Sequence, residues 1–128
     1  MAYCPAMAED PPVLSVADAA GWRAWLGEHH DECDAVWVAL AKKGTTEPTS
    51  LTYDQALEEA LCHGWIDGLV RGGDERTYPQ RFTPRRVRSR WSAGNVALVE
   101  RLIAEGRMHP AGLAAIERAR ADGRAGGA

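Results

Sequence analysis

The chain has 128 residues, 45% hydrophobic and 26% charged, which is typical of one compact domain with its own core. No apolar run approaches the ~20 residues of a membrane span and residues 1–12 lack a secretory pattern, so we expect a cytoplasmic protein without membrane insertion. Three cysteines (Cys4, Cys33 and Cys62) without CxxC spacing argue against a disulfide framework or a zinc site.

The net charge of −3 conceals an uneven distribution of charge along the chain. Residues 1–70 hold twelve acids and three bases, whereas residues 71–91 hold seven arginines and two acids. Guanidinium groups bind phosphates and carboxylates bidentately, so the arginine segment is either an anion site or a set of internal ion pairs. The pI of 5.8 is far below that of a typical nucleic-acid-binding protein, so nucleic acid is not an expected partner.

An arm and a helix are expected first. Residues 1–14 contain three prolines, which deny the segment regular hydrogen bonding, so we expect a flexible arm. Ser15 followed by Asp18 resembles a capping box and predicts a helix from about residue 16 to His30. His29 and His30 adjoin acids but lack metal-ligand spacing, and we interpret them as surface residues.

A strand and a second helix are expected next. Residues 35–43 place apolar side chains on both faces, which is typical of a central strand with neither face fully in water. Thr52 and Gln55 form a second capping box, for a helix from Tyr53 to about residue 63. Gly64 is well placed to end that helix.

A hairpin follows the second helix. Residues 65–71 and 76–83 flank a four-residue turn with two glycines, which predicts two antiparallel strands. Pro79 cannot donate a hydrogen bond to a ladder, so we expect the second of these strands at a sheet edge.

Two more helices complete the predicted domain. Ser92 is suited to cap a helix that ends at Gly106, and Pro110 to begin a last helix that ends near residue 122. The order helix, strand, helix, strand, strand, helix, helix predicts an α+β fold, with a small, mostly antiparallel sheet of about three strands covered by helices. Residues 15–122 would form this single domain, and residues 123–128 a disordered tail.

Cys62 and Asp67 are weak candidates for catalysis. Cys62 precedes His63, but adjacent helical residues do not face each other, and a helix C-terminus near glutamates disfavours a thiolate. A small packing residue is therefore the simpler interpretation of Cys62. Asp67 lies between apolar neighbours, so it needs an arginine or several N–H donors, or else it faces a cleft as a functional carboxylate. Gly68 indicates that another backbone or a ligand comes close.

A ligand site is predicted between the strand at residues 65–71 and the arginine segment. Guanidinium groups would hold charge, aromatic rings would supply flat apolar contact, and a helix start would offer free N–H groups. The residues assigned to this site are Trp65, Asp67, Arg71, Tyr78, Arg81, Arg85, Arg86, Ser89 and Trp91. In the alternative interpretation, Trp91 only docks the loop and the arginines are solvated.

Three of these segments resemble the bacterial YdeI/OmpD-associated family. The resemblance rests on EALCHGWIDG at residues 59–68, on Tyr78 with RFTPR at 81–85, and on SRWS at 89–92 with Asn95. It covers roughly residues 13–122, and His63 stands where many members have an aromatic residue. The resemblance implies a role in bacteriocin protection or stress resistance, tied in some members to tolerance of cationic antimicrobial peptides. It implies no set of catalytic residues.

Three functional hypotheses follow. The first is a stress- or antimicrobial-resistance protein that binds a small anionic molecule, a toxin included, or an acidic partner surface. The second is a hydrolase or group-transfer enzyme with Asp67 as general base or Cys62 as nucleophile. The third is an oligomeric interaction module, such as a homodimer, that exposes some of its five tryptophans. The sequence lacks cofactor motifs and metal-ligand spacing, so we expect neither a cofactor nor a metal.

Overall fold

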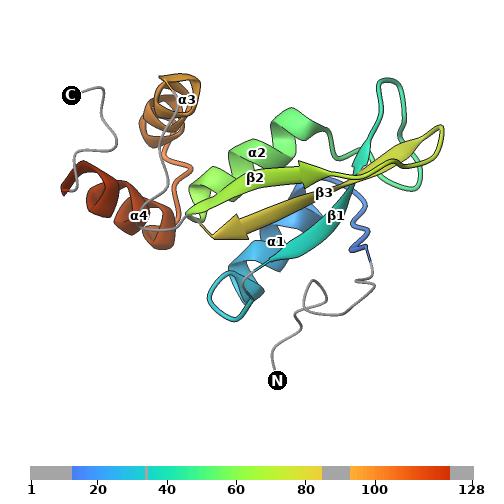
Figure 1. Ribbon diagram of the computed structural model, residues 1–128. Helices are drawn as coiled ribbons and strands as arrows, with labels where there is room; N and C mark the ends of the chain where they lie inside the picture. The colour runs from blue at the N-terminus through green and yellow to red at the C-terminus, as the bar shows by residue number, and fades with distance from the viewer. Residues whose placement is uncertain (1–12, 34, 85–92, 122–128) are drawn as a thin grey trace.

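A computed structural model describes residues 13–33, 35–84 and 93–121 (Figure 1). In chain order these residues form helix α1 (Ala19–His29), strand β1 (Val36–Ala41), helix α2 (Tyr53–Cys62), strands β2 (Trp65–Val70) and β3 (Thr77–Pro84), and helices α3 (Ala93–Ala104) and α4 (Pro110–Ala121). The predicted α+β class and the predicted order of elements are confirmed, with the three strands in one antiparallel sheet. None of the described helices is long and apolar enough to cross a membrane.

The strand order is β1-β3-β2, so β3 is central and the expectation of an edge position for it is wrong. The pairing of β2 with β3 shifts register between Asp67 and Val70, beside Pro79, so the missing N–H falls where the ladder is already irregular. The Gln80 side chain then donates to the Gly68 carbonyl over 3.0 Å. A proline is therefore tolerated in the central strand because a bulge accompanies it.

The expectation of a central position for β1 is also wrong, although its outer edge is partly paired. The Leu14 N–H donates to the Trp37 carbonyl over 2.8 Å, and the Ala39 N–H donates to the Leu14 carbonyl over 2.9 Å. This isolated parallel bridge to Val38 ties a residue of the expected arm to the sheet. All six residues of β1 are buried, although the strand lies at the edge of the described three-stranded sheet.

Helix α1 begins three residues later than predicted. Asp18, and not Ser15, is the N-cap, because its side chain accepts a hydrogen bond from the Gly21 N–H over 3.0 Å. His29 and His30, interpreted from the sequence as surface residues, are both partly exposed. The His30 Nδ1 donates to the Leu26 carbonyl over 2.8 Å at the end of the helix.

The other helix boundaries agree with the sequence where the structure describes them. The capping box of Thr52 and Gln55 starts α2, and Gly64 follows the helix with a φ of 81°, a left-handed conformation that suits glycine. Pro110 opens α4 as predicted. The predicted cap Ser92 and the tail at residues 123–128 lie outside the described residues.

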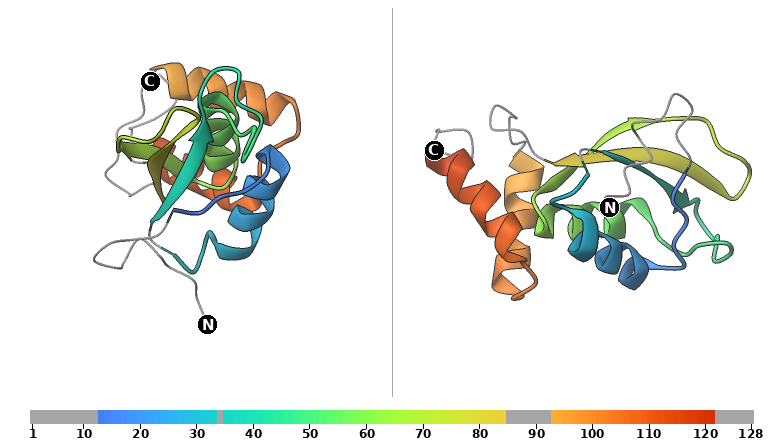
Figure 2. Two further views of the ribbon diagram at one scale, coloured as in Figure 1. Left: turned by 90° about the vertical axis from the view of Figure 1, so that its right-hand side faces the viewer. Right: turned by 90° about the horizontal axis from the view of Figure 1, so that it is seen from below.

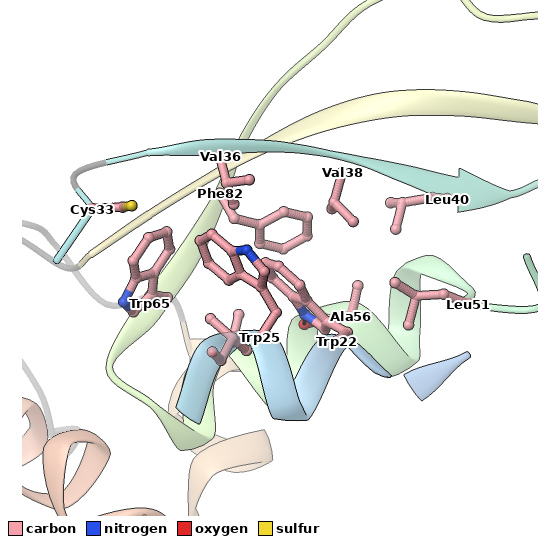
Figure 3. Close-up of a cluster of buried hydrophobic side chains, with 12 residues drawn as sticks. Trp22, Trp25, Cys33, Val36, Val38, Leu40, Leu51, Ala56, Trp65 and Phe82 are labelled. Carbon is pink, nitrogen blue, oxygen red and sulfur yellow. Dashed lines mark hydrogen bonds between the residues drawn. The ribbon is translucent and has the colours of Figure 1, made fainter. Parts of the chain in front are cut away.

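The helices cover one face of the sheet and one of its ends. Figure 2 shows α1 and α2 together on one side of the strands, with α3 and α4 beyond the end of the sheet. Between the sheet and α1 lies a core cluster that includes three tryptophans and the inward side chains of β1 and β3 (Figure 3). Its buried members are Trp22, Trp25, Leu26, Cys33, Val36, Val38, Leu40, Leu51, Ala56, Ala60, Trp65 and Phe82. Burying one such large side chain stabilises the fold by about 1.5–3 kcal/mol.

A second core cluster joins α2 to α3 and α4. Its buried members are Leu57, Leu61, Cys62, Val99, Leu102 and Ile116. The two clusters meet along α2, which therefore holds the sheet and the C-terminal helices together.

Candidate functional site

The two faces of the sheet differ in what covers them. Val38 and Phe82 point toward α1 and α2, and we call this side the inner face (Figure 3). Successive residues of a strand point to opposite sides, so Trp37 and Arg81 lie on the other side, which we call the outer face. These two residues are direct cross-strand partners. None of the described helices lies over the outer face (Figure 2).

The predicted ligand residues are divided between these faces. The sequence pattern put Trp65, Asp67 and Arg71 on one side of their strand, which is wrong for Arg71. Asp67 pairs with Phe82 on the inner face, but the register shift before Val70 reverses the alternation. Arg71 therefore lies on the outer face, with its guanidinium over the Trp37 ring.

Trp65 belongs to the core. Its side chain is 1% exposed, and its ring meets Trp25 edge-on with centroids 5.9 Å apart. The indole Nε1 donates to the His30 carbonyl over 3.3 Å. These contacts give Trp65 a packing role and leave it no surface for a ligand.

Asp67 meets a tyrosine rather than the expected arginine or N–H donors. The Tyr53 hydroxyl, from the first residue of α2, donates to Asp67 Oδ2 over 2.7 Å. Burial and this hydrogen bond raise the pKa of Tyr53 well above its usual range, so the phenol remains a donor. Tyr78 lies partly buried on the same inner face, where burial raises its pKa as well. The hydrogen bond between Tyr53 and Asp67 therefore ties β2 to α2.

The close approach indicated by Gly68 is to the protein's own backbone. A Cβ at this position would lie 3.3 Å from the Arg81 carbonyl oxygen. Gly68 thus fits the bulged pairing of β2 with β3.

Cys62 is buried at the end of α2, with a side chain in the second core cluster. Burial, and then the charge of Glu59, raise the pKa of the Cys62 thiol to about 11. The thiol is therefore protonated at neutral pH, in the surroundings of a packing residue.

Two arginines are placed at Trp37 on the outer face, one by ring stacking and one by strand pairing. We call Arg71 and Arg81 the outer-face arginine pair. The centre of the Arg71 guanidinium lies 4.3 Å from the centroid of the Trp37 ring. Arg81 stands beside Trp37 on the neighbouring strand, where directly opposed Cβ atoms are typically about 5 Å apart. Trp37 was absent from the predicted site. The alternation of β1 places it opposite the core-facing residues, a signal that could have found it.

Among the residues that the structure describes, neither arginine of this pair has a carboxylate within ion-pair distance. The acids of the first half pair with arginines elsewhere. Glu59 binds Arg23 and Arg107 over 2.8 and 3.0 Å, and Glu58 binds Arg101 and Arg107 over 2.9 and 2.7 Å. Internal pairing thus occupies arginines outside the 71–91 segment, whereas the two on the outer face form no ion pair with a described residue.

Four residues of the predicted site, Arg85, Arg86, Ser89 and Trp91, lie outside the described residues. A separate open hollow of about 230 Å³ is lined by residues 44–47 and Arg76. In the described part of the chain, no group of three histidine, cysteine, aspartate or glutamate residues is placed to hold a metal ion.

Comparison with known proteins identifies the family of the chain. Residues 14–115, which include α1, the whole sheet, α2 and α3, match the family model described as a domain of unknown function (DUF8412). The chain belongs to this family. No curated protein and no solved structure matches the DUF8412 protein significantly.

Proposed function

We propose that the DUF8412 protein binds a small anionic ligand, or an acidic patch of a partner, on the outer face of its sheet. The observation that carries the proposal is the outer-face arginine pair, which has no carboxylate partner among the described residues. A phosphate or carboxylate would accept charge-assisted hydrogen bonds from both side chains, the strongest kind that guanidinium groups make.

The arrangement around Trp37 favours binding because it orders one guanidinium in advance. Stacking on the indole ring restricts Arg71, so less side-chain entropy is lost when an anion binds. Arg81 lies on the neighbouring strand as the cross-strand partner of Trp37, so it adds a second guanidinium on the same face. Two guanidiniums in this relation suit an anion with several oxygens, such as pyrophosphate or a dicarboxylate.

The biological setting of the proposal comes from the resemblance to the YdeI/OmpD-associated family. On that basis the ligand or partner would be bound in the cytoplasm, during resistance to stress or to an antimicrobial toxin. Arg85 and Arg86, which the sequence assigned to the same site, follow β3 directly in the sequence and lie outside the described residues.

A thermal-shift titration tests the proposal, with inorganic pyrophosphate, citrate and a short polyglutamate peptide as probes at low and moderate salt. A ligand at ~100 times its Kd adds about 2.7 kcal/mol of stability, which raises the melting temperature by several degrees. We expect Arg71→Gln and Arg81→Gln each to remove most of that shift, and added salt to reduce it.

Arg118→Gln is the charge-matched control, because Arg118 is exposed on α4, away from the sheet. The rise in melting temperature that a probe causes in this variant should equal the rise in the natural protein. The proposal is contradicted if no probe produces a shift, or if the Arg118 variant loses as much of the shift as the Arg81 variant.

A further inference from the structure

Three histidines from separate segments lie in mutual ring contact, and we call them the histidine cluster. His30 is the C-cap of α1, His63 is the C-cap of α2, and His109 directly precedes α4. Their ring centroids are 4.8 Å apart for His63 and His109, 4.9 Å for His30 and His109, and 5.8 Å for His30 and His63. The cluster therefore joins the ends of three helices.

The hydrogen bonds of the cluster require a neutral ring at His109. Its Nδ1 accepts from the Ala111 N–H over 3.0 Å, which caps the first turn of α4. A doubly protonated imidazolium has no acceptor nitrogen, so protonation would abolish this cap. His30 and His63 instead donate through Nδ1 to the carbonyls of Leu26 and Glu59, over 2.8 and 2.9 Å.

The first turn of α4 is pressed directly against the end of α2. The His109 N–H donates to the Cys62 carbonyl over 2.9 Å, and a Cβ at Gly112 would lie only 2.2 Å from that same oxygen. On the α2 side, a Cβ at Gly64 would lie 3.1 Å from the Ala111 carbonyl. Such close backbone contact fixes the start of α4 against the end of α2, so a shift of the His109 backbone away from His63 requires α4 to move from its docked position.

Four described glutamates near the cluster have basic partners in arginine or histidine. The Glu59 carboxylate on α2 binds Arg23 of α1 and Arg107 of the segment before α4, and Glu58 binds Arg101 of α3 and Arg107. On α1, His29 contacts the carboxylates of Glu28 and Glu32, while Cys62 on α2 is protonated. These acids are thus engaged elsewhere, and neighbouring imidazolium groups would repel one another.

We propose that the histidine cluster is a pH-sensitive latch, whose neutral form docks α4 onto the ends of α1 and α2 and whose protonation releases the start of α4. Burial lowers the pKa of His63 and outweighs the hydrogen bond to the Glu59 carbonyl, which raises it, while the neighbouring histidines lower it further. A histidine with a lowered pKa in the folded state stabilises that state above its ordinary pKa of about 6.5, and the contribution is lost as the pH falls from that value through the folded-state pKa. Release should therefore begin at mildly acidic pH.

The experiment measures exposure of Cys62, which packs in the same core cluster as Ile116 of α4, with 4,4′-dithiodipyridine, a thiol reagent that remains active in acid. Mass spectrometry of peptides assigns the label to Cys62 and separates it from Cys4 and Cys33. Between about pH 7.5 and 5.5 we expect the rate to rise at least about five-fold relative to a small free thiol. Tryptophan fluorescence should show that the sheet core remains folded across this range.

Two variants identify the histidines as the cause. His109→Asn keeps a side-chain oxygen that caps α4 but cannot titrate, and His63→Phe keeps an aromatic ring. Each should reduce the rise to less than about two-fold, whereas His29→Gln, outside the cluster, should retain it fully. If His63→Phe does not fold, His109→Asn decides the test alone. The latch is overturned if the labelling rate of Cys62 does not rise in acid, or if His109→Asn shows the full rise. It is also overturned if tryptophan fluorescence shows that the sheet core unfolds over the same pH range.

Discussion

The outer face of the sheet and the region where α1, α2 and α4 meet both contain arginines, but the two sets have different surroundings. At the helix junction, Arg23 and Arg107 converge on Glu59, whose side chain is only 4% exposed. On the outer face, Arg71 stacks on the Trp37 ring and Arg81 lies opposite Trp37 on the neighbouring strand. Neither has a carboxylate partner in the described part of the chain. The comparison teaches that partners, and not the density of arginine in the sequence, separate structural arginines from those available to a ligand.

The largest effect is expected from a steric change at the helix junction. Gly112→Ala would place a methyl group 2.2 Å from the Cys62 carbonyl oxygen, so α4 would have to move away from α2. We expect a loss of about 3 kcal/mol in the free energy of unfolding, measured in urea. Gly27→Ala in α1 is the matched control, because nothing lies within 4 Å of its new Cβ. It should be neutral or stabilising by up to about 1 kcal/mol. Equal stability of the two variants would contradict the tight docking of α4.

The next effect comes from the buried carboxylate of the junction. Burial raises the pKa of Glu59, but hydrogen bonds and charges from Arg23 and Arg107 outweigh burial and hold it below its usual range. Glu59→Gln should cost about 2 kcal/mol near neutral pH, less than for a wholly buried pair because the Arg23 side chain is 58% exposed. Urea unfolding of the variant checks this value, with the exposed Glu75→Gln as a near-neutral control.

The same carboxylate predicts a dependence of stability on pH. Because the folded-state pKa is lowered, its contribution is present above the ordinary glutamate pKa and is lost as the pH falls through the folded-state value. Unfolding free energies measured down to about pH 3 should therefore fall less steeply for Glu59→Gln than for the natural protein. Parallel curves would contradict the pairing of Glu59 with the two arginines.

A smaller effect is expected on the inner face. Tyr53→Phe removes the hydroxyl that donates to Asp67, so the half-buried carboxylate loses a hydrogen bond worth about 1 kcal/mol. Tyr78→Phe on β3 is a close control, since no described residue bonds to its hydroxyl. If both variants lose the same stability, the hydrogen bond does not tie β2 to α2.

The smallest effect on stability is expected at the outer face itself. Arg81→Gln should change the free energy of unfolding by less than about 0.5 kcal/mol, because no ion pair is lost. Arg107→Gln breaks contacts to Glu58 and Glu59 and should cost about 1–2 kcal/mol. Similar losses in these two variants would remove the distinction between the two sets of arginines.

Local sequence signals predicted most of the elements, because capping and turn chemistry act over a few residues. Thr52 with Gln55, Gly64 and Pro110 mark helix ends that the structure confirms. The position of β3 could not be predicted in this way, because the bulge that accommodates Pro79 depends on its pairing with β2.

The candidate site was harder to predict for the same reason. One shifted residue moved Arg71 to the face opposite Asp67, where it meets Trp37 from a distant strand. Nothing near His30 in the sequence reveals that His63 and His109 pack against it. Tertiary contacts decide both cases.

The most direct test of the account is a map of where an anion binds. Two-dimensional NMR spectra of the amides and arginine side chains would be recorded while inorganic pyrophosphate is added. The account predicts that the largest shifts fall on Arg71, Trp37 and Arg81, and that Arg23 and Arg107 stay unchanged because Glu59 already holds them. Shifts confined to the helix junction, or to the hollow at residues 44–47, would contradict it.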